Sequence, residues 1–469
     1  MSELKKAHKG GLSGYLPDET PSIPKMILFA LQQVLVMFPA TVLVALLTGF
    51  HVSTTIFASG LATLCFLLIT RGKIPLYFGS SFSYIPAVAA ITGVGFGQIA
   101  PDSLISAAQF GILMSGFVSI AAGLIVSRFS MEKIERVLPP TVTGSIALVI
   151  GLSLAAVALT NAIGWNGAEL AANSNKMWVV ALITLISTIL FSVYLKGMWA
   201  QIPILLGIAL GYVVSIPLGL IDFSTIFAGQ VFSMPHFTLP SISWPAALAI
   251  MPIAIATIPE STAHLFQLDI YVKDLARKKG KDPHKYNIEE KLGLNLIGDG
   301  VGDIVAALFG GPGGTNYGEN ISTMAITRNF SVFMLGTAAV IAIILSFFTP
   351  LSNLVLSVPS AVINGACIFL FGVIAAQGIA IMINKRVDLF SARNLAVIAT
   401  ILIIALGGTY GFPNGMIPFF GTELPPIAAG ALFGILLNLL LSIGKDGYDA
   451  MSDEKDSFVE AVAHDEDGF

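Results

Sequence analysis

The sequence predicts an all-α polytopic membrane protein with fourteen transmembrane segments. The prediction rests on the composition, on a series of long apolar runs and on the placement of the basic residues. Hydrophobic residues make up 55% of the 469 residues, and the mean hydropathy is +0.84. Charged residues make up only 11%, against roughly 25% in soluble domains. So few charges could not cover a water-soluble protein of this length, which excludes soluble enzymes, nucleic-acid-binding proteins and disordered scaffolds.

The apolar runs are long enough to cross the hydrocarbon core of a bilayer, which is about 30 Å thick and needs about 20 helical residues. Two runs, 74–95 and 312–327, are rich in Gly, Pro and hydroxyl residues. We expect broken backbone there, which a membrane tolerates where the backbone lines a cavity. The fourteen predicted spans are 27–48, 53–70, 74–95, 103–126, 140–162, 177–195, 201–220, 246–268, 292–309, 312–327, 330–349, 360–383, 392–408 and 425–443.

The basic residues test this count independently, because cytoplasmic loops retain Lys and Arg. With fourteen spans and the N-terminus inside, all of the 24 basic residues except Lys176 fall on the cytoplasmic side. One span more or fewer in the middle would destroy this segregation. We therefore expect an integral protein surrounded by lipid in a plasma membrane, the inner membrane in a bacterium, with both termini in the cytoplasm.

The two halves of the chain carry a weak trace of duplication. Phe78-Gly79 in the third span and Tyr317-Gly318 in the tenth occupy corresponding positions, as do Phe38-Pro39 in the first span and Ile258-Pro259 in the eighth. Two sets of seven spans must be inverted relative to each other, because seven is an odd number. Inverted repeats with interrupted helices at matching positions are typical of a transporter with its binding site at the membrane midplane.

Four acidic residues and one histidine lie at membrane depth, where an ionisable group is a functional candidate by default. Glu260 and His264 are spaced i, i+4, which places them on one face of a helix within hydrogen-bonding reach. Such a pair could hold a proton that moves when a ligand binds. The alternative is a pair that only satisfies its own polarity between packed helices. The remaining three acids are Asp299, Asp303 and Glu319.

Glu319 lies in a segment too rich in glycine and asparagine to be a uniform helix. There the carboxylate and the free backbone groups could bind a planar heterocyclic amide such as uracil, which alternates N–H donors with C=O acceptors. The alternative is that Glu319 only caps the half-helix that begins near Ile321. The aromatic residues Phe82, Tyr84 and Tyr317 could supply a stacking wall, although packing is the simpler explanation for each of them taken alone, since aromatic residues are common in membrane spans.

Asp299 and Asp303 are also spaced i, i+4 and directly precede the broken segment. We expect them to brace that segment by accepting its free N–H groups, with a cation or proton site as the alternative. Cys65 and Cys367 lie in apolar runs, so neither a disulfide nor a metal site is expected.

Together these residues resemble the nucleobase–ascorbate transporter (uracil/xanthine permease) family, and within it the uracil permeases. The resemblance covers residues 20–445 and is carried by Gly79-Ser80-Ser81-Phe82, Glu260 with His264, Gly298-Asp299-Gly300 and Tyr317-Gly318-Glu319-Asn320-Ile321. It implies short strands in spans three and ten, and a core domain and a gate domain. The implied divisions are an N-terminal cytoplasmic segment (1–24), the core (25–138 and 244–349), the gate (139–243 and 350–444) and an acidic cytoplasmic tail (445–469).

The resemblance also implies roles for individual residues. Phe82 would pack on the pyrimidine, Glu260 and Glu319 would bind its polar edge, and the backbone at Tyr317 and Gly318 would add contacts. His264 would bond to Glu260 and take part in proton coupling. A glutamate in span ten separates uracil-type from purine-type members, although Ser322 replaces a glycine found in many uracil permeases. The supporting residues would be Ser81, Asp299, Asp303 and Asn320.

We therefore expect uracil import by proton symport with alternating access, as a homodimer, with H⁺ as coupling ion, no metal or other cofactor and no nucleic-acid partner. The alternatives are a xanthine or purine symporter and an anion transporter of the same architecture, although the membrane interior here carries acids and no basic residue. A channel is a further alternative. An intramembrane hydrolase is disfavoured, because the sequence has no His-Glu-x-x-His motif and no evident nucleophile–base pair.

Overall fold

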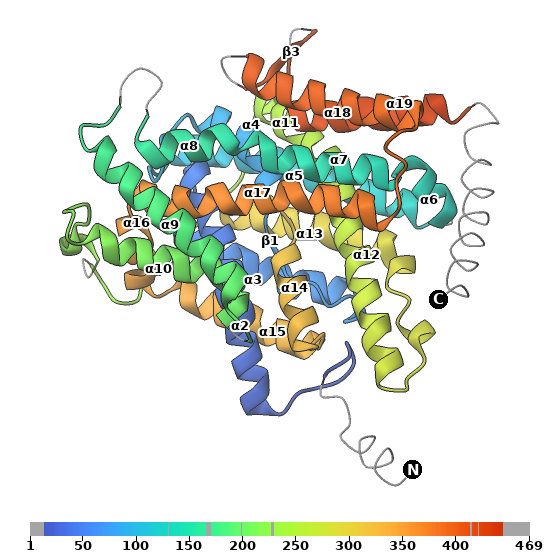
Figure 1. Cartoon of the computed structure of the whole chain (residues 1–469), viewed down its shortest axis with the longest axis horizontal. Coiled ribbons are helices and arrows are strands. Elements are labelled where there is room, and N and C mark those ends of the chain that lie inside the picture. The colour runs from blue at the N-terminus through green and yellow to red at the C-terminus, as the bar shows by residue number, and fades with distance from the viewer. Residues whose placement is uncertain are drawn as a thin grey trace, which may run out of the picture.

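The computed structural model describes residues 14–129, 131–165, 170–197, 199–226, 229–412, 415–420 and 422–443. Long helices surround a central pair of short strands (Figure 1), which confirms the predicted all-α membrane fold. The helices are α2 (Ile23–Thr48), α3 (Val52–Ile69), α4 (Ile85–Thr92), α5 (Asp102–Val126), α6 (Met131–Val137), α7 (Pro140–Ser153), α8 (Ala155–Ile163), α9 (Ser174–Tyr194), α10 (Pro203–Ser215), α11 (Trp244–Ile250), α12 (Ala254–Lys278), α13 (Leu292–Phe309), α14 (Gly318–Thr327), α15 (Val332–Ser346), α16 (Thr349–Ser357), α17 (Ser360–Asn384), α18 (Ala392–Gly411) and α19 (Pro426–Leu441). The strands are β1 (Phe78–Ser80), β2 (Gly314–Asn316), β3 (Ile417–Phe419) and β4 (Thr422–Leu424).

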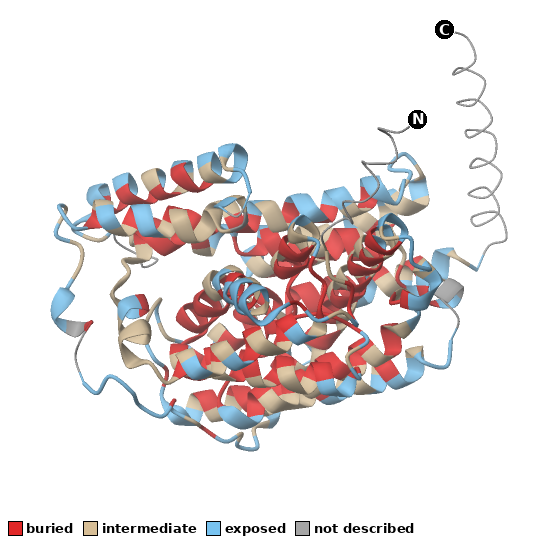
Figure 2. Cartoon of the chain, turned by 90° about the horizontal axis from the view of Figure 1, so that it is seen from below, coloured by how far each residue is buried: buried red, intermediate tan, exposed pale blue. Residues whose placement is uncertain are grey.

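Nine helices of the described residues are long and apolar enough to cross a membrane, and four shorter apolar helices accompany them. Large apolar side chains such as Leu68 and Ile403, 76% and 73% exposed, lie on the outer surface of the molecule, where lipid would cover them. Buried residues gather between the helices (Figure 2). The molecule is therefore built as an integral membrane protein, and the count of fourteen crossings stays a prediction.

Several elements differ from the predicted spans. The fifth span, 140–162, is divided at Leu154 into α7 and α8. The eighth is longer than expected, because α11 and α12 together run from Trp244 to Lys278. The first part of the charged segment 269–291 is helical and belongs to α12, with Asp269 buried and paired with Lys273 at 2.8 Å. Residues 1–13 and the predicted acidic tail 445–469 lie outside the described residues.

The helices pack into two groups. In the first group, α13 packs against α3 and α5, and α15 packs against α2 and α3. In the second group, α17 packs against α7, α8, α9 and α10, and α18 packs against α7 and α19. Helix α12 contacts both groups, since it packs against α7 and α19 as well as α13 and α14. The predicted core and gate boundaries themselves stay a prediction.

Glycines let the backbones of α5 and α13 cross at close range. A Cβ atom at Gly300 would lie 2.4 Å from the Gly116 carbonyl oxygen, and one at Gly116 would lie 2.6 Å from the Gly300 oxygen. A second reciprocal contact joins Gly123 and Gly293 seven residues away on each helix. Small residues at such crossings are the usual means of helix association in membranes, where lipid removes the hydrophobic driving force.

We expect Gly300→Ala to lower the free energy of unfolding by about 1–3 kcal/mol, because the added methyl group overlaps the α5 backbone. The measurement is the melting temperature of the purified protein in detergent. Gly407→Ala in α18 is the matched control, since a Cβ there meets nothing within 4 Å. It should leave stability unchanged or raise it by up to about 1 kcal/mol through helix propensity. Equal shifts in the two variants would contradict the overlap.

The segment before α2 is tied to the ends of α12 and α14. The Tyr15 backbone N–H donates to the Arg328 carbonyl at 2.8 Å, and the Tyr15 carbonyl accepts from Phe330 N–H at 2.8 Å. Glu19 pairs with Lys279 and Lys281 at 2.5 and 2.7 Å. Partial burial opposes ionisation of Glu19, but the hydrogen bonds from the two lysines outweigh it and hold the pKa of this carboxyl below its ordinary value.

Because the pKa of Glu19 is depressed in the folded chain, its contribution to stability is present above the ordinary glutamate pKa of about 4.3 and is lost as the pH falls through the folded value. We expect Glu19→Gln to cost about 1 kcal/mol at pH 7 and nothing at a pH below the folded value. Melting temperatures across this pH range measure the effect. The exposed Glu135 supplies the control variant, Glu135→Gln. A Glu19→Gln penalty that does not change with pH would rule out the ionic origin.

Candidate substrate-binding site

The two broken segments meet at the centre of the molecule. Strands β1 and β2 pair antiparallel, with Phe78 opposite Asn316, Gly79 opposite Thr315 and Ser80 opposite Gly314. The pairing needs glycine, because a Cβ at Gly79 would lie 2.4 Å from the Tyr317 ring and one at Gly314 would lie 2.4 Å from the Gly79 oxygen. The predicted strands in spans three and ten are therefore present and pair with each other.

Side chains of neighbouring helices satisfy the outer edges of this two-stranded sheet. On the β1 side, the hydroxyls of Ser59 and Thr63 in α3 donate to the Phe78 carbonyl at 2.9 Å each, and Thr63 Oγ1 accepts from Phe78 N–H at 3.1 Å. On the β2 side, Asp303 Oδ1 accepts from Gly314 N–H at 2.7 Å. Unsatisfied backbone at membrane depth costs several kcal/mol, so these bonds allow non-helical chain there.

Asp303 thus makes the bracing contact that we expected from the sequence. Its second oxygen accepts from the Tyr84 hydroxyl at 3.0 Å, and that hydroxyl also bonds to Ser115 Oγ at 2.7 Å. Tyr84 is completely buried in this cluster and does not line the central cavity, so it is not part of a stacking wall.

Asp299 braces β2 through side chains rather than through backbone. It accepts a short hydrogen bond from Ser261 of α12 and a 3.4 Å bond from the Asn316 amide. The Asn316 and Asn295 amides both donate to Ser261 Oγ, at 2.9 and 2.7 Å. This buried network joins α12, α13 and β2 directly behind the central cavity. A cation or proton role for either aspartate stays a prediction.

Glu260, His264 and Glu319 line one small cavity, of about 40 Å³, beside the strands. Phe82 lines it as well, and its ring meets that of Phe371 edge-on with 5.6 Å between centroids. Both η2 (Phe82–Tyr84), which leads into α4, and α14 begin at this cavity, so the positive ends of two helices face it. The complete lining consists of Ser80, Ser81, Phe82, Glu260, His264, Thr315, Asn316, Tyr317, Gly318, Glu319, Ile374 and Gln377.

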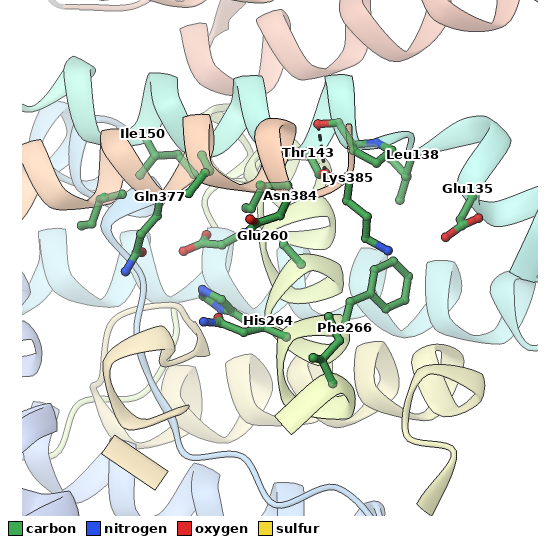
Figure 3. A pocket seen from close by; sticks show the side chains of 18 of the residues that line it. Glu135, Leu138, Thr143, Ile150, Glu260, His264, Phe266, Gln377, Asn384 and Lys385 are labelled. Atoms are coloured by element: carbon green, nitrogen blue, oxygen red, sulfur yellow. Dashed lines mark hydrogen bonds between the residues drawn. The ribbon is translucent and has the colours of Figure 1, made fainter. Parts of the chain in front are cut away.

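Two larger cavities adjoin the central one and share its lining. One, of about 280 Å³, contains Glu260 and His264 and extends between α12 and α17 as far as Lys385. The other, of about 210 Å³, contains Glu319 and lies between α14 and the helices α10 and α17. Figure 3 shows Glu260 and His264 projecting from α12 to the side where Gln377 of α17 lies. The central cavity is therefore bounded by both groups of helices.

Glu260 and His264 share a helical face, but the hydrogen bond expected between them does not form. The Glu260 carboxylate accepts instead from the hydroxyls of Ser81 and Ser83, at 3.3 and 3.2 Å. The imidazole lies against β2 and α14, since its Nε2 would be 2.9 Å from a Cβ at Gly318, and its buried Nδ1 has no partner among the described residues. Glu260 thus bonds to the two serines rather than to His264, which spacing along the helix alone does not reveal.

Tyr317 and Asn320 are held in place by hydrogen bonds to residues of α2. The Tyr317 hydroxyl bonds to Thr41 Oγ1 in α2 at 2.9 Å, and of the three predicted aromatic residues Phe82 and Tyr317 line the cavity whereas Tyr84 does not. The Asn320 amide donates to the Gln33 side chain at 2.7 Å and to the Gln33 carbonyl at 3.1 Å. These bonds fix α14 to α2 and hold Glu319 in the first helical turn, beside the cavity.

Sequence reasoning missed Gln377, Ile374 and Ser83. Gln377 lines all three cavities, and Ile374 lies beside it on α17. Gln377 is one of two amide side chains, with Asn364, in the apolar run 360–383, and this was the available signal. For Ser83, the hydroxyl-rich run after Gly79 pointed to the segment but not to the residue that bonds Glu260.

Known proteins resemble the chain over most of its length. The profile of the xanthine and uracil permeases, described as the Permease family, matches residues 24–414. A uracil permease of Bacillus caldolyticus is 38% identical over 432 residues, which is 90% of this chain and 94% of that protein. A uracil permease of Escherichia coli (strain K12) is 34% identical over 427 residues, which is 91% of this chain and 93% of that protein.

Solved transporter structures share the fold. The murine Slc26a9 anion transporter in its inward-facing state superposes with a TM-score of 0.63, 12% identity and coverage of 91% of this chain and 69% of that one. The transmembrane domain of the cyanobacterial bicarbonate transporter BicA gives a TM-score of 0.52, 13% identity and coverage of 89% and 97%. At such low identity the likeness shows the fold alone. The family profile and the relatives go further, and by them this chain belongs to the uracil/xanthine permease family of membrane transport proteins, which are not enzymes.

Proposed function

We propose that this protein imports uracil, or a closely related pyrimidine, by proton symport. The observation that carries the proposal is that two carboxylates from distant parts of the chain, Glu260 and Glu319, line one cavity with Phe82. Carboxylates accept hydrogen bonds from N–H groups, and an aromatic ring packs on a flat heterocycle. Relatives that are 34–38% identical over some nine-tenths of the chain are uracil permeases, which supports the same substrate here.

In the proposed complex the pyrimidine lies against Phe82, with its N–H groups directed at Glu260 and Glu319. The backbone at Tyr317 and Gly318 offers further contacts, because α14 begins there and its first N–H groups have no partner within the helix. The Ser322 hydroxyl does not donate a hydrogen bond to the ligand, because it already donates to the Gly318 carbonyl at 3.0 Å. The serine found in place of glycine therefore acts mainly through its volume.

The same cavity suits alternating access. Residues of η2, α12 and α14 line one part of it, while Ile374 and Gln377 of α17 belong to the second group of helices. Sliding of one group against the other would open the cavity to either side. The 280 Å³ cavity reaches Lys385, which the charge distribution assigns to the cytoplasm, and this supports an inward-directed state in the proposed cycle.

Proton coupling would use Glu260 and His264. A proton on the Glu260 carboxyl would alter its bonds to Ser81 and Ser83 and would change how it meets the substrate. His264, with an unpartnered Nδ1 among the described residues, is placed to accept or pass that proton. The proposal needs no other cofactor. It places the protein in the bacterial inner membrane with cytoplasmic termini, as a homodimer that contacts its partner through the gate helices.

A xanthine or purine symporter is the second candidate, because the family includes both substrate classes. The carboxylate at Glu319 favours the pyrimidine, as the resemblance to uracil-type members implies. An anion transporter of the same fold is disfavoured, since no Lys or Arg is among the described residues that line the central cavity. Binding of uracil, thymine, 5-fluorouracil and xanthine by the purified protein at two pH values tests these candidates directly, and xanthine binding tighter than uracil binding would reverse the assignment.

We expect Glu260→Gln and Glu319→Gln each to weaken uracil binding by about 10–100-fold, because a hydrogen bond to a charged group contributes about 1.5–3 kcal/mol. Scintillation-proximity binding and uptake of radiolabelled uracil measure the loss. Glu135 lies in α6 and lines the large cavity but not the central one, so Glu135→Gln is the control and should bind normally. Near-normal uptake by both site variants would refute the assignment.

We expect His264→Leu to flatten the pH dependence of uracil uptake while weakening uracil binding by only about fivefold, the cost of one hydrogen bond of about 1 kcal/mol. Uptake into proteoliposomes with and without a pH gradient separates the two effects. A variant that keeps the wild-type response to the gradient would show that His264 takes no part in coupling.

A further inference from the structure

A group of side chains that could bind a metal ion lies where helices α3 and α5 begin. His51 precedes α3, Asp102 is the first residue of α5, and His236 belongs to the segment 233–243 between α10 and α11. Their ligand atoms all lie within 4.8 Å of one another. His236 Nε2 is 3.0 Å from both Asp102 oxygens, and the two imidazole rings are 4.4 Å apart at 38°.

The segment that carries His236 is held in place by bonds that do not involve its ring. Thr54 Oγ1 of α3 donates to the His236 carbonyl at 2.7 Å. Buried Gln109 of α5 donates to the Thr238 carbonyl at 2.8 Å and accepts from the Thr238 hydroxyl at 2.8 Å. Farther along, Ser241 N–H donates to the Ser106 carbonyl at 3.0 Å. The segment that carries His236 is thus held against α3 and α5 independently of any ion.

The chemistry of the group suits a borderline transition metal rather than calcium or magnesium. Two imidazole nitrogens and one carboxylate oxygen match zinc, whereas Ca²⁺ and Mg²⁺ prefer oxygen ligands. Ligand atoms around a tetrahedral zinc ion lie about 3.3 Å apart, given bond lengths of about 2.0–2.1 Å. The 3.0 Å separation of His236 Nε2 and Asp102 is close to this value, so an ion could replace the proton between them with little movement.

We propose that His51, Asp102 and His236 form a binding site for a divalent transition metal ion of the zinc class. The fourth position of a tetrahedral site is left for water, because His236 and Asp102 are 50% and 59% exposed. The ion would fasten segment 233–243 to the N-terminal ends of α3 and α5, within the first group of helices. The site lies apart from the carboxylate cavity and does not depend on the substrate.

The test is binding of Zn²⁺ to the purified full chain after removal of any histidine tag, followed by calorimetry and by the zinc-dependent rise in melting temperature. We expect one ion per chain. His51→Ala and His236→Ala should each weaken binding by at least about tenfold, since loss of an outer partner of a ligand already costs about 10–100-fold. The exposed His284 supplies the matched control, His284→Ala, which should bind zinc normally.

A second measurement does not depend on alanine variants. Co²⁺ in the wild-type chain should give the visible absorption of a four-coordinate ion, and the conservative variant Asp102→Asn should reduce it, while melting temperatures without metal confirm that the variants are folded. The proposal is overturned if the wild-type chain binds no Zn²⁺, or if the double variant His51→Ala/His236→Ala binds it with unchanged stoichiometry and affinity. Competition by excess Mg²⁺ would likewise contradict the assigned ligand set.

Discussion

The antiparallel pairing of β1 with β2 is the interaction on which the rest of the structure depends. Three residues of each strand replace helical hydrogen bonds at membrane depth, and the backbone can do this only if every strand edge finds a partner. Ser59 and Thr63 serve β1, while Asp303 serves β2. Helices α3 and α13 must therefore lie against the strands with their polar side chains inward, which accounts for buried hydroxyls and carboxylates within apolar helices.

This pairing also brings the candidate ligand groups together. The chain leaves β1 into η2, with Phe82, and leaves β2 into α14, with Glu319 in its first turn. Glycine at positions 79 and 314 keeps the strands close, and Gly318 leaves room for the His264 ring. Residues from opposite halves of the sequence thus reach one cavity of about 40 Å³ because their strands are neighbours, not because their helices pack directly.

The sequence was sufficient to predict the features that arise because burying polar groups in a membrane costs free energy. Intramembrane acids are expensive, so Glu260, Glu319 and Asp303 stood out, and glycine-rich runs pointed to the broken segments. It was insufficient where several side chains compete for one partner. Glu260 bonds to two serines instead of His264, and Asp299 bonds to side chains instead of backbone N–H groups. Such choices depend on three-dimensional distances of a few tenths of an ångström, and periodicity along one helix does not contain them.

Gln377 shows why the second group of helices was hardest to assign. Gln377 lies in α17, which packs closely on α7 through glycines. A Cβ at Gly144 would clash with the Gly378 carbonyl, and a Cβ at Gly378 would clash with the Gly144 carbonyl. Of the two α17 residues that line the central cavity, Gln377 has a polar side chain and Ile374 an apolar one. In the proposed transport cycle, the carboxylates and Phe82 would move as one unit against this amide. Contacts between the ligand and α17 would then form and break with each reorientation, whereas contacts with the strands would persist. The first group of helices would therefore determine how tightly the ligand binds, and the second group would determine which side of the membrane it can reach.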